Sequence, residues 1–219
     1  ALGNFQFLPS VYRRHAVDGD GDGRIDLWDS LPDAAESAAN FLSARGWQPE
    51  ERWGREVRLP DGFDYGLAET GRSVADWRRA GLRQANGDSL PTADLTARLI
   101  IPTGAEGPAF LVYPNFDVIM RWNPSRFYAL SVGHLADRLI GAPALHNPPP
   151  DHPALSIDTI EALQTALNER GFDAGAVDGR LGPQTREAIR GLQTQQGMTR
   201  DGYPDSEILA ELGIEQSEG

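Results

Sequence analysis

Five prolines fall within the thirteen residues 141–153, and no other feature of the sequence constrains the fold as strongly. A segment this rich in proline cannot continue a helix and forms an extended, semi-rigid spacer. We therefore expect a linker over residues 142–153, which separates one domain at 1–141 from a second at 154–219. At roughly 100–200 residues per domain, a chain of 219 residues has room for two small domains.

The segment before the linker combines helical and β-type patterns. Apolar residues at helical spacing predict one helix over 33–45 and another over 127–140, each followed by or ending near a glycine. Between them, residues 53–113 alternate short β-branched or aromatic runs with Gly, Pro and Asp turns, which indicates a small β-rich insertion. The candidate strands are 55–59, 98–101 and 108–113.

The segment after the linker predicts three short helices. Apolar side chains recur at helical spacing over residues 156–171, 183–196 and 205–212. Three amphipathic helices in so short a segment bury their apolar faces against one another. We therefore expect a compact three-helix module at the carboxy-terminal end.

An acidic, glycine-rich run at residues 18–29 has the pattern of a twelve-residue calcium-binding loop. Carboxylates occupy positions 1, 3 and 5, and Gly23 at position 6 permits the sharp turn of such loops. Three carboxylates this close repel one another unless a cation lies between them. The predicted ligands are Asp18, Asp20, Asp22, the carbonyl group of Arg24, and either Asp29 at position 12 or Asp33 in the next helix. The alternative is a solvated acidic turn without a metal.

Charge and composition exclude several classes of function. The 20 basic and 32 acidic residues sum to a net charge of −12, which repels nucleic acid. The absence of cysteine excludes disulfides and thiolate metal sites, and the four histidines lack metal-ligand spacing. No apolar stretch approaches the roughly 20 residues of a membrane-spanning helix. Phosphate-loop, dinucleotide and serine-nucleophile motifs are also missing from the sequence.

Two sets of motifs resemble families that act on the bacterial cell wall. The first resembles the membrane-bound lytic transglycosylase B family, and it includes Gln6-Phe7-Leu8-Pro9-Ser10, Leu27-Trp28-Asp29 and Arg121-Trp122-Asn123-Pro124-Ser125. The second resembles the three-helix peptidoglycan-binding domain over residues 155–212, and it includes Asp178-Gly179, Gly182 and Asp201-Gly202. Together the two resemblances cover nearly the whole chain.

The resemblance implies an α+β fold with two parts. The first is a portion of a lysozyme-like transglycosylase core that carries the EF-hand-like calcium loop and the β-rich insertion, and the second is the peptidoglycan-binding domain. The family cleaves the β-1,4 bond between MurNAc and GlcNAc and closes a 1,6-anhydro ring on the product. The resemblance implies substrate-binding roles for Gln6, Phe41, Trp122, Asn123 and Tyr128, with Phe41 standing where many relatives have Tyr.

The catalytic Glu of the family lies on a helix well before the segment that matches Gln6–Ser10. We expect this residue upstream of Ala1, so no catalytic residue is assigned in this chain. The remaining carboxylates considered do not match the family position; they are Glu36, Glu50, Glu51, Glu56 and Glu106. Two main hypotheses follow: part of a lytic transglycosylase, or a non-catalytic peptidoglycan-binding protein that positions other cell-wall enzymes. A third alternative is a calcium-stabilised structural module with no affinity for sugar.

The implied partners are peptidoglycan glycan strands and their stem peptides. The implied location is the periplasm or cell envelope, with attachment to the outer membrane through residues upstream of this chain. Calcium is the expected cofactor, in a structural role, because a single loop without a paired partner is a poor sensor.

Overall fold

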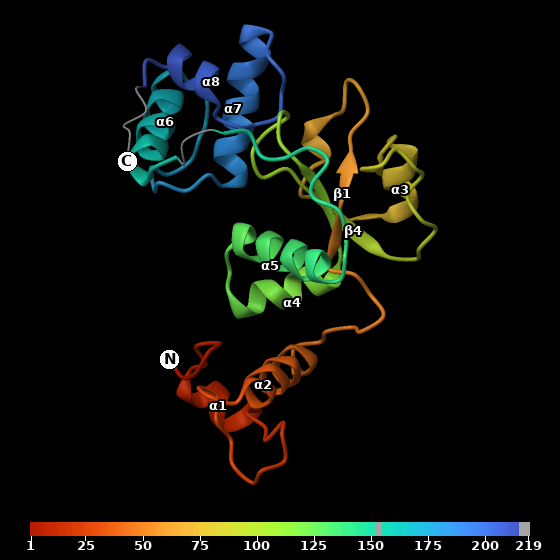
Figure 1. Cartoon of the computed structure of the whole chain (residues 1–219). Helices are drawn as coiled ribbons and strands as arrows, with labels where there is room; N and C mark the ends of the chain where they lie inside the picture. Colours follow the sequence, from red (N-terminus) through yellow and green to blue (C-terminus); the bar gives the residue numbers. More distant parts are fainter. Residues whose placement is uncertain (152–154, 215–219) are drawn as a thin grey trace. The chain divides into compact units, whose positions relative to one another are not determined.

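The computed structural model describes residues 1–151 and 155–214 (Figure 1). The chain forms two compact units: unit 1 combines Ala1–Gly54 with Val112–Ala142, and unit 2 combines Arg55–Leu111 with the described part of Pro143–Gly219. The chain therefore passes from one unit to the other three times. The β-rich insertion and the three-helix segment share unit 2. The domain limits expected at 141 and 154 stay predictions, and residues 152–154 lie outside the described ranges.

Unit 1 contains four helices, which are α1 (Pro9–His15), α2 (Leu31–Ala44), α4 (Pro114–Trp122) and α5 (Arg126–Leu139). Ser30 and Ser125 cap α2 and α5, because each hydroxyl accepts a hydrogen bond from a backbone N–H in the first turn. These two helices confirm the predictions at 33–45 and 127–140. The other two were not predicted. Each begins with a proline, which is tolerated there because an N–H group at the first helical position has no partner within the helix.

The buried side chain of Asn115 attaches the segment before β1 to α4. Its Oδ1 accepts a hydrogen bond from the backbone N–H of Gln48 at 2.9 Å. Its Nδ2 donates to the carbonyl groups of Gln48 and Glu51, both at 2.8 Å. This fully buried side chain therefore pairs three backbone groups of a segment that lies outside any helix or strand.

Trp53 attaches the same segment to α5. Its indole N–H donates to the carboxylate of Asp137 at 3.0 Å, and its ring packs over Gly133. A Cβ atom at Gly133 would lie 2.4 Å from the ring, which is too close for any other residue. The glycine within α5 is therefore required by packing.

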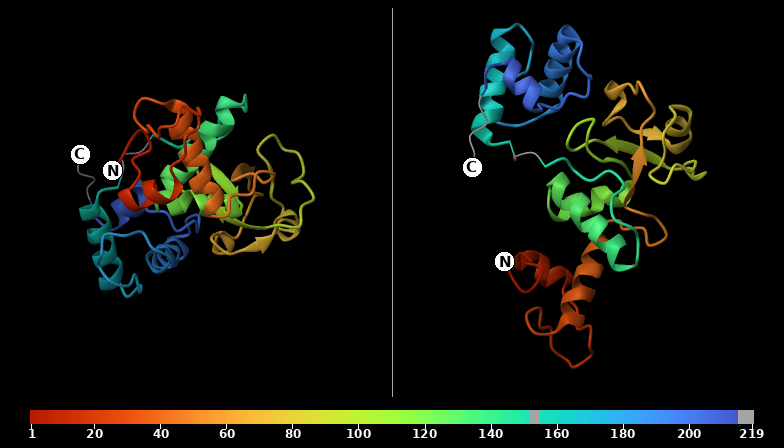
Figure 2. Two further views of the ribbon diagram at one scale, coloured as in Figure 1. Left: turned by 90° about the horizontal axis from the view of Figure 1, so that it is seen from below. Right: turned by 45° about the horizontal axis from the view of Figure 1, so that its top comes forward.

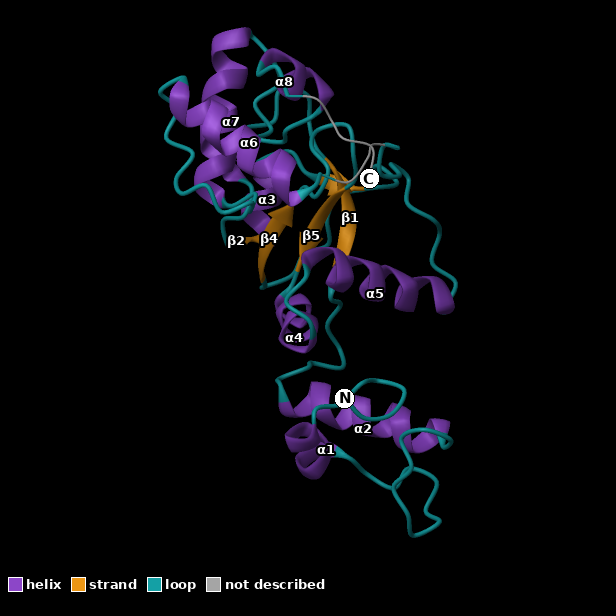
Figure 3. Ribbon diagram, turned by 90° about the vertical axis from the view of Figure 1, so that its left-hand side faces the viewer, coloured by secondary structure: helices purple, strands orange, loops and turns teal. Residues whose placement is uncertain are grey.

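Unit 2 is built around a five-stranded sheet in the order β2-β4-β5-β1-β3, and Figure 3 shows the adjacent strands β2, β4, β5 and β1. The strands are β1 (Gly54–Arg58), β2 (Arg72–Ser73), β3 (Arg83–Gln84), β4 (Thr96–Ile100) and β5 (Ala109–Val112). Strands β1 and β3 pair antiparallel with Val57 opposite Gln84, and β2 and β4 with Arg72 opposite Ala97. The three candidate strands of the sequence match β1, β4 and β5.

Two short helical segments accompany the sheet: a 3₁₀ turn, η1 (Tyr65–Leu67), and a helix, α3 (Val74–Arg79). The fully buried Trp77 of α3 donates its indole N–H to the carbonyl of Ala97 in β4 at 3.0 Å. This bond joins α3 to the sheet, and the mixture of helices and strands confirms the expected α+β class.

The carboxy-terminal part of unit 2 is a three-helix bundle (Figure 2). Its helices are α6 (Ile157–Glu169), α7 (Pro183–Gln196) and α8 (Ser206–Glu211), and they confirm the three predicted helices. They enclose one apolar core, whose buried members are Leu163, Leu167, Ala174, Ala188, Ile189, Leu192, Ile208 and Leu209.

A buried amide organises the turn between α6 and α7. The Oε1 atom of Gln164 accepts hydrogen bonds from the N–H groups of Asp178 and Gly179, both at 3.0 Å. Its Nε2 atom donates to the carboxylate of Asp178 at 3.0 Å and to the hydroxyl of Thr185 at 3.1 Å. Gly179 has a φ of +68°, and a Cβ atom there would lie 2.5 Å from Ile157. The Asp178-Gly179 motif is thus a structural turn.

The proline-rich segment is fastened to the sheet near its middle. One carboxylate oxygen of Glu56 in β1 accepts the N–H of His146 at 2.9 Å, and the other accepts the N–H of Asn147 at 2.8 Å. The described part of the predicted linker, residues 142–151, contains no helix or strand. Of the helices in the described ranges, none combines the length and apolar character that crossing a bilayer demands.

Candidate functional site

The acidic loop joins α1 to α2, and it brings three of the predicted metal ligands together. Asp18, Asp20 and Asp22 each place a carboxylate oxygen within 4.8 Å of the other two. Oxygen donors at alternate positions of a short loop suit a hard cation such as calcium. Within the described residues, Asp29 and Asp33 lie outside this group.

Backbone hydrogen bonds to the same carboxylates shape the loop. Asp18 accepts the N–H of Gly21 at 2.7 Å and of Gly23 at 2.8 Å, one on each oxygen. Asp22 accepts the N–H of Arg24 at 2.8 Å. Gly21 and Gly23 have φ values of +76° and +89°, in the left-handed region that favours glycine. The alternating Asp-Gly pattern therefore allows the loop to curl around its own acidic side chains.

Asp33 is buried in the first turn of α2 and anchors both ends of the loop. One of its oxygens accepts the N–H of Gly19 at 2.7 Å, and the other accepts that of Asp26 at 2.7 Å. These bonds, led by the one from Asp26, lower the pKa of the Asp33 carboxyl. Both oxygens of Asp33 thus accept hydrogen bonds from the backbone, whereas the sequence offered this residue as one of two alternatives for the last metal ligand.

Asp26, at loop position 9, has a structural role that sequence reasoning missed. Its Oδ1 accepts the N–H groups of Asp29 at 3.0 Å and Trp28 at 2.9 Å, and these two bonds lower its pKa. An Asp that bonds the backbone two and three residues later is a common turn former, which is the signal that the sequence offered. Asp29 therefore occupies a turn that Asp26 fixes.

The aromatic residues predicted at the sugar-binding groove form one cluster in unit 1. The half-buried ring of Trp122, at the end of α4, lies 4.9 Å from Phe41, 5.4 Å from Phe7 and 6.1 Å from Phe5, centroid to centroid. Phe41 is only 5% exposed, so Trp122 packs against a buried ring. Aromatic pairs at these distances and tilts contribute beyond their buried area.

The three polar residues predicted at the groove lie at helix boundaries or in turns. Gln6 is exposed, has a φ of +54°, and donates from Nε2 to the carbonyl of Gly3 at 2.8 Å. Asn123 ends α4, and its Oδ1 accepts the N–H of Ser125 at 3.2 Å. Tyr128 is half-buried in the first turn of α5, and its hydroxyl has no partner among the described residues.

A left-handed backbone at a residue other than glycine is uncommon, and such positions cluster at functional sites. The conformation of Gln6 therefore agrees with a role in binding. The geometry also places Asn123 and Trp122 next to each other at the turn between α4 and α5.

Two of the carboxylates considered as proton donors have structural contacts. Glu56, whose side chain is 9% exposed, uses both oxygens for the linker. Glu51 accepts a hydrogen bond from Asn115 through its backbone carbonyl, and its buried Oε2 has no hydrogen-bond partner in the described part of the chain. Neither arrangement gives the chain a proton donor next to the Trp122 cluster.

Comparison with known proteins gives two family matches. Residues 1–137 match the Transglycosylase SLT domain, and residues 156–212 match a peptidoglycan binding domain. The membrane-bound lytic murein transglycosylase B of Escherichia coli K12 is 37% identical over 142 residues, which are 62% of this chain and 37% of that protein.

Solved structures give the same result. The crystal structure of SltB3 from Pseudomonas aeruginosa in complex with NAG-anhNAM-pentapeptide is 44% identical, with a TM-score of 0.89 over 97% of this chain and 58% of SltB3. The Escherichia coli lytic transglycosylase SLT35 in complex with calcium is 33% identical, with a TM-score of 0.50 over 64% of this chain and 44% of that protein. The chain thus spans less than two thirds of the length of each of these relatives.

Proposed function

Since the chain belongs to the Transglycosylase SLT family, we propose that it is part of a lytic transglycosylase that cleaves peptidoglycan. The reaction breaks the β-1,4 bond between MurNAc and GlcNAc and leaves a 1,6-anhydro product, with the catalytic Glu lying upstream of this chain. The observation that carries the proposal is the likeness to SltB3, a structure in complex with NAG-anhNAM-pentapeptide, over 97% of this chain.

In this proposal the chain holds the glycan, and the upstream Glu moves the proton. The Glu donates a proton to the glycosidic oxygen and then accepts one from the 6-hydroxyl of MurNAc as the anhydro ring closes, so no second carboxylate is required. The half-buried ring of Trp122 would stack on a sugar ring, and the amides of Gln6 and Asn123 would bind acetamido and hydroxyl groups. The hydroxyl of Tyr128, which has no partner within residues 1–151 and 155–214, adds one more donor.

We further propose that the acidic loop binds calcium through Asp18, Asp20 and Asp22. The donor set supports this, because three carboxylate oxygens within 4.8 Å favour a hard divalent cation. A calcium complex of the relative SLT35 also supports it. The ion would neutralise these charges and tie the loop to α1 and α2, which is a structural role.

The remaining parts of the proposal concern location and partners. We place the protein in the periplasm or cell envelope because its substrate is there, and a relative is described as membrane-bound. The match of residues 156–212 to a peptidoglycan binding domain supports attachment to the wall. Tethering a binding module to a core raises the local concentration of substrate.

A pull-down with purified peptidoglycan sacculi tests the proposal. The chain is expected in the pellet, and Tyr128→Phe, which removes one hydroxyl, should weaken retention without changing the melting temperature. Trp28→Phe is the matched control, because Trp28 is exposed and outside the Trp122 cluster. Mass spectrometry of the supernatant then distinguishes the two hypotheses.

Anhydro products from a longer protein with the upstream Glu, and none from this chain, support the enzyme hypothesis. No products from either protein would favour the alternative, a non-catalytic binder that positions other cell-wall enzymes. An unbound chain would refute both hypotheses.

A further inference from the structure

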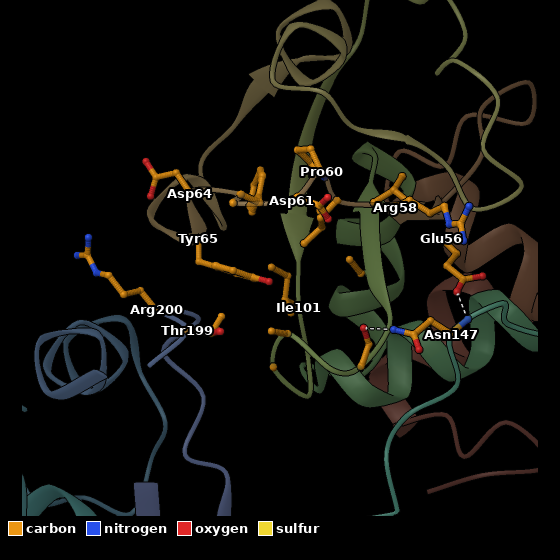
Figure 4. Close-up of a pocket in the computed structure, with 18 of the residues that line it drawn as sticks. Glu56, Arg58, Pro60, Asp61, Asp64, Tyr65, Ile101, Asn147, Thr199 and Arg200 are labelled. Atoms are coloured by element: carbon orange, nitrogen blue, oxygen red, sulfur yellow. Dashed lines mark hydrogen bonds between the residues drawn. The ribbon is translucent and has the colours of Figure 1, made fainter. Parts of the chain in front are cut away.

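Unit 2 contains a cleft of about 900 Å³ that none of the roles assigned above uses (Figure 4). Residues 56–65, from β1 into the turn after it, form one side, and the loop between β4 and β5 forms another. Thr199 and Arg200 of the three-helix bundle and residues 146–147 of the proline-rich segment complete the lining. The cleft is thus built from four separate stretches of sequence.

The bundle is fastened to the β4–β5 loop beside this cleft. The carboxylate of Asp201 accepts the N–H of Ala105 at 2.7 Å with one oxygen and the side-chain amide of Gln193 at 2.7 Å with the other. A Cβ atom at Gly104 would lie 2.9 Å from both Asp201 and Tyr203. Glycine at 104 therefore permits a close approach that places Arg200 at the edge of the cleft.

The opposite end of the cleft is also fixed. The two bonds from Glu56 hold the backbone of residues 146–147, and the side-chain amide of Asn147 donates to the carbonyls of Glu106 at 3.1 Å and Gly107 at 2.7 Å. Side chains that need no rearrangement lose little freedom when a ligand binds. The cleft therefore exists before any ligand enters.

Several polar groups in the cleft have no protein partner. The ring of Tyr65 packs edge-on against Phe63 at 5.4 Å and extends toward Ile101, and its hydroxyl makes no hydrogen bond within the described ranges (Figure 4). Burial raises the pKa of Tyr65, so the hydroxyl stays a donor at neutral pH. The exposed guanidinium of Arg200 has no ion-pair partner in residues 1–151 and 155–214.

Acidic groups lie on the same cleft. Asp61 is exposed and has no hydrogen-bond partner among the described residues, and Asp64 uses one oxygen to cap η1. The cleft thus offers a cation, a neutral hydroxyl donor and carboxylates along one surface. An uncharged saccharide would leave the charges unpaired, whereas a peptide presents carboxylates, an amine and backbone carbonyls that match them.

We propose that this cleft binds the peptide stem of peptidoglycan, an inference that rests on the proposed function. Arg200 would pair with a free carboxylate of the stem, the Tyr65 hydroxyl would donate to a peptide carbonyl, and Asp61 would accept from an amine. The sugar-binding residues lie in unit 1, so sugars and peptide are recognised by different units of the chain.

Calorimetry with the free stem pentapeptide, which carries no sugar, tests the inference on the whole chain. Arg200→Ala should weaken binding at least tenfold, and Tyr65→Phe about fivefold, because each removes one polar partner. Arg83→Ala is the matched control: Arg83 is an exposed arginine of the same sheet, and it does not line the cleft. The disaccharide without peptide should not compete for the site.

The outcomes separate this inference from the proposed function. Retention on sacculi without binding of the free pentapeptide overturns the inference and leaves the proposed function standing. Equal affinity in all three variants, or competition by the peptide-free disaccharide, also overturns it. Loss of sacculus binding by the unaltered chain refutes the proposed function instead, whatever the pentapeptide does.

Discussion

Replacing Asn115 with alanine tests whether one buried amide holds residues 48–51 against α4. The change removes three hydrogen bonds, two to carbonyl groups and one from an N–H. Each is worth about 1 kcal/mol net, so unit 1 should lose about 3 kcal/mol of unfolding free energy. With a urea dependence of about 2 kcal/mol per molar, the midpoint of its transition falls by about 1.5 M.

Tryptophan fluorescence during urea unfolding is the assay. Four of the five tryptophans, at 28, 47, 53 and 122, belong to unit 1, so the signal reports mainly on that unit. Gln48→Ala is the control, because Asn115 hydrogen-bonds the backbone of residue 48, and the Gln48 side chain itself donates to the Gly46 carbonyl. This control should change stability by less than about 0.5 kcal/mol.

The comparison can refute the reasoning in two ways. A loss below about 1 kcal/mol for Asn115→Ala would mean that water replaces the amide at little cost. An equal loss for Gln48→Ala would mean that the segment is held by its own side chain. Asn115→Asp adds a further check, because it turns the donor toward two carbonyls into a carboxylate and should cost at least as much.

Three more predictions concern calcium, packing and pH. Calcium should raise the melting temperature, and excess chelator should reverse the rise. The double variant Asp18→Asn with Asp22→Asn should abolish this shift, whereas the exposed control Asp151→Asn should keep it. Gly133→Ala should cost about 1–3 kcal/mol because its Cβ meets the Trp53 ring, whereas Ser131→Ala on the exposed face of α5 should be neutral by thermal unfolding. Hydrogen bonding from Gln164 and the Arg180 N–H lowers the pKa of Asp178. The carboxylate therefore stabilises the bundle fully above its unfolded pKa near 3.8, and this stabilisation is lost as the pH falls below that value. The stability of Asp178→Asn should depend less on pH in this acid range, and an unchanged acid transition would contradict this account.

Local patterns predicted five of the eight α-helices in the described residues, and their absence explains the three that were missed, of which α3 is the shortest with six residues. The three-helix bundle follows from regular apolar spacing, so its elements were predicted nearly to the residue at α7. Helix α1 has only seven residues and no apolar repeat, and α4 contains the short apolar run 118–120, which periodicity alone cannot assign to a helix. Tertiary contacts such as those of Asn115 decide these segments.

In the candidate site, too, some contacts follow from sequence spacing and others depend on tertiary packing. The clustering of Asp18, Asp20 and Asp22 follows from their spacing in the loop, whereas the bonds from Asp33 to Gly19 and Asp26 arise only when α2 packs against the loop. The contact between Glu56 and residues 146–147 joins positions about ninety residues apart, so no local pattern could reveal it. The cleft of unit 2 depends on that contact and was invisible in the sequence.

The fastening of the proline-rich segment by Glu56 has a mechanical consequence. If the three-helix bundle is held by the wall and the wall moves, tension along the chain reaches residues 146–147 before it reaches α5. There it meets two parallel hydrogen bonds on β1, a strand inside the five-stranded sheet, with β5 and β3 on either side. The load is then shared by the sheet, and the turn between α4 and α5 that carries Trp122 and Asn123 is shielded from the pull.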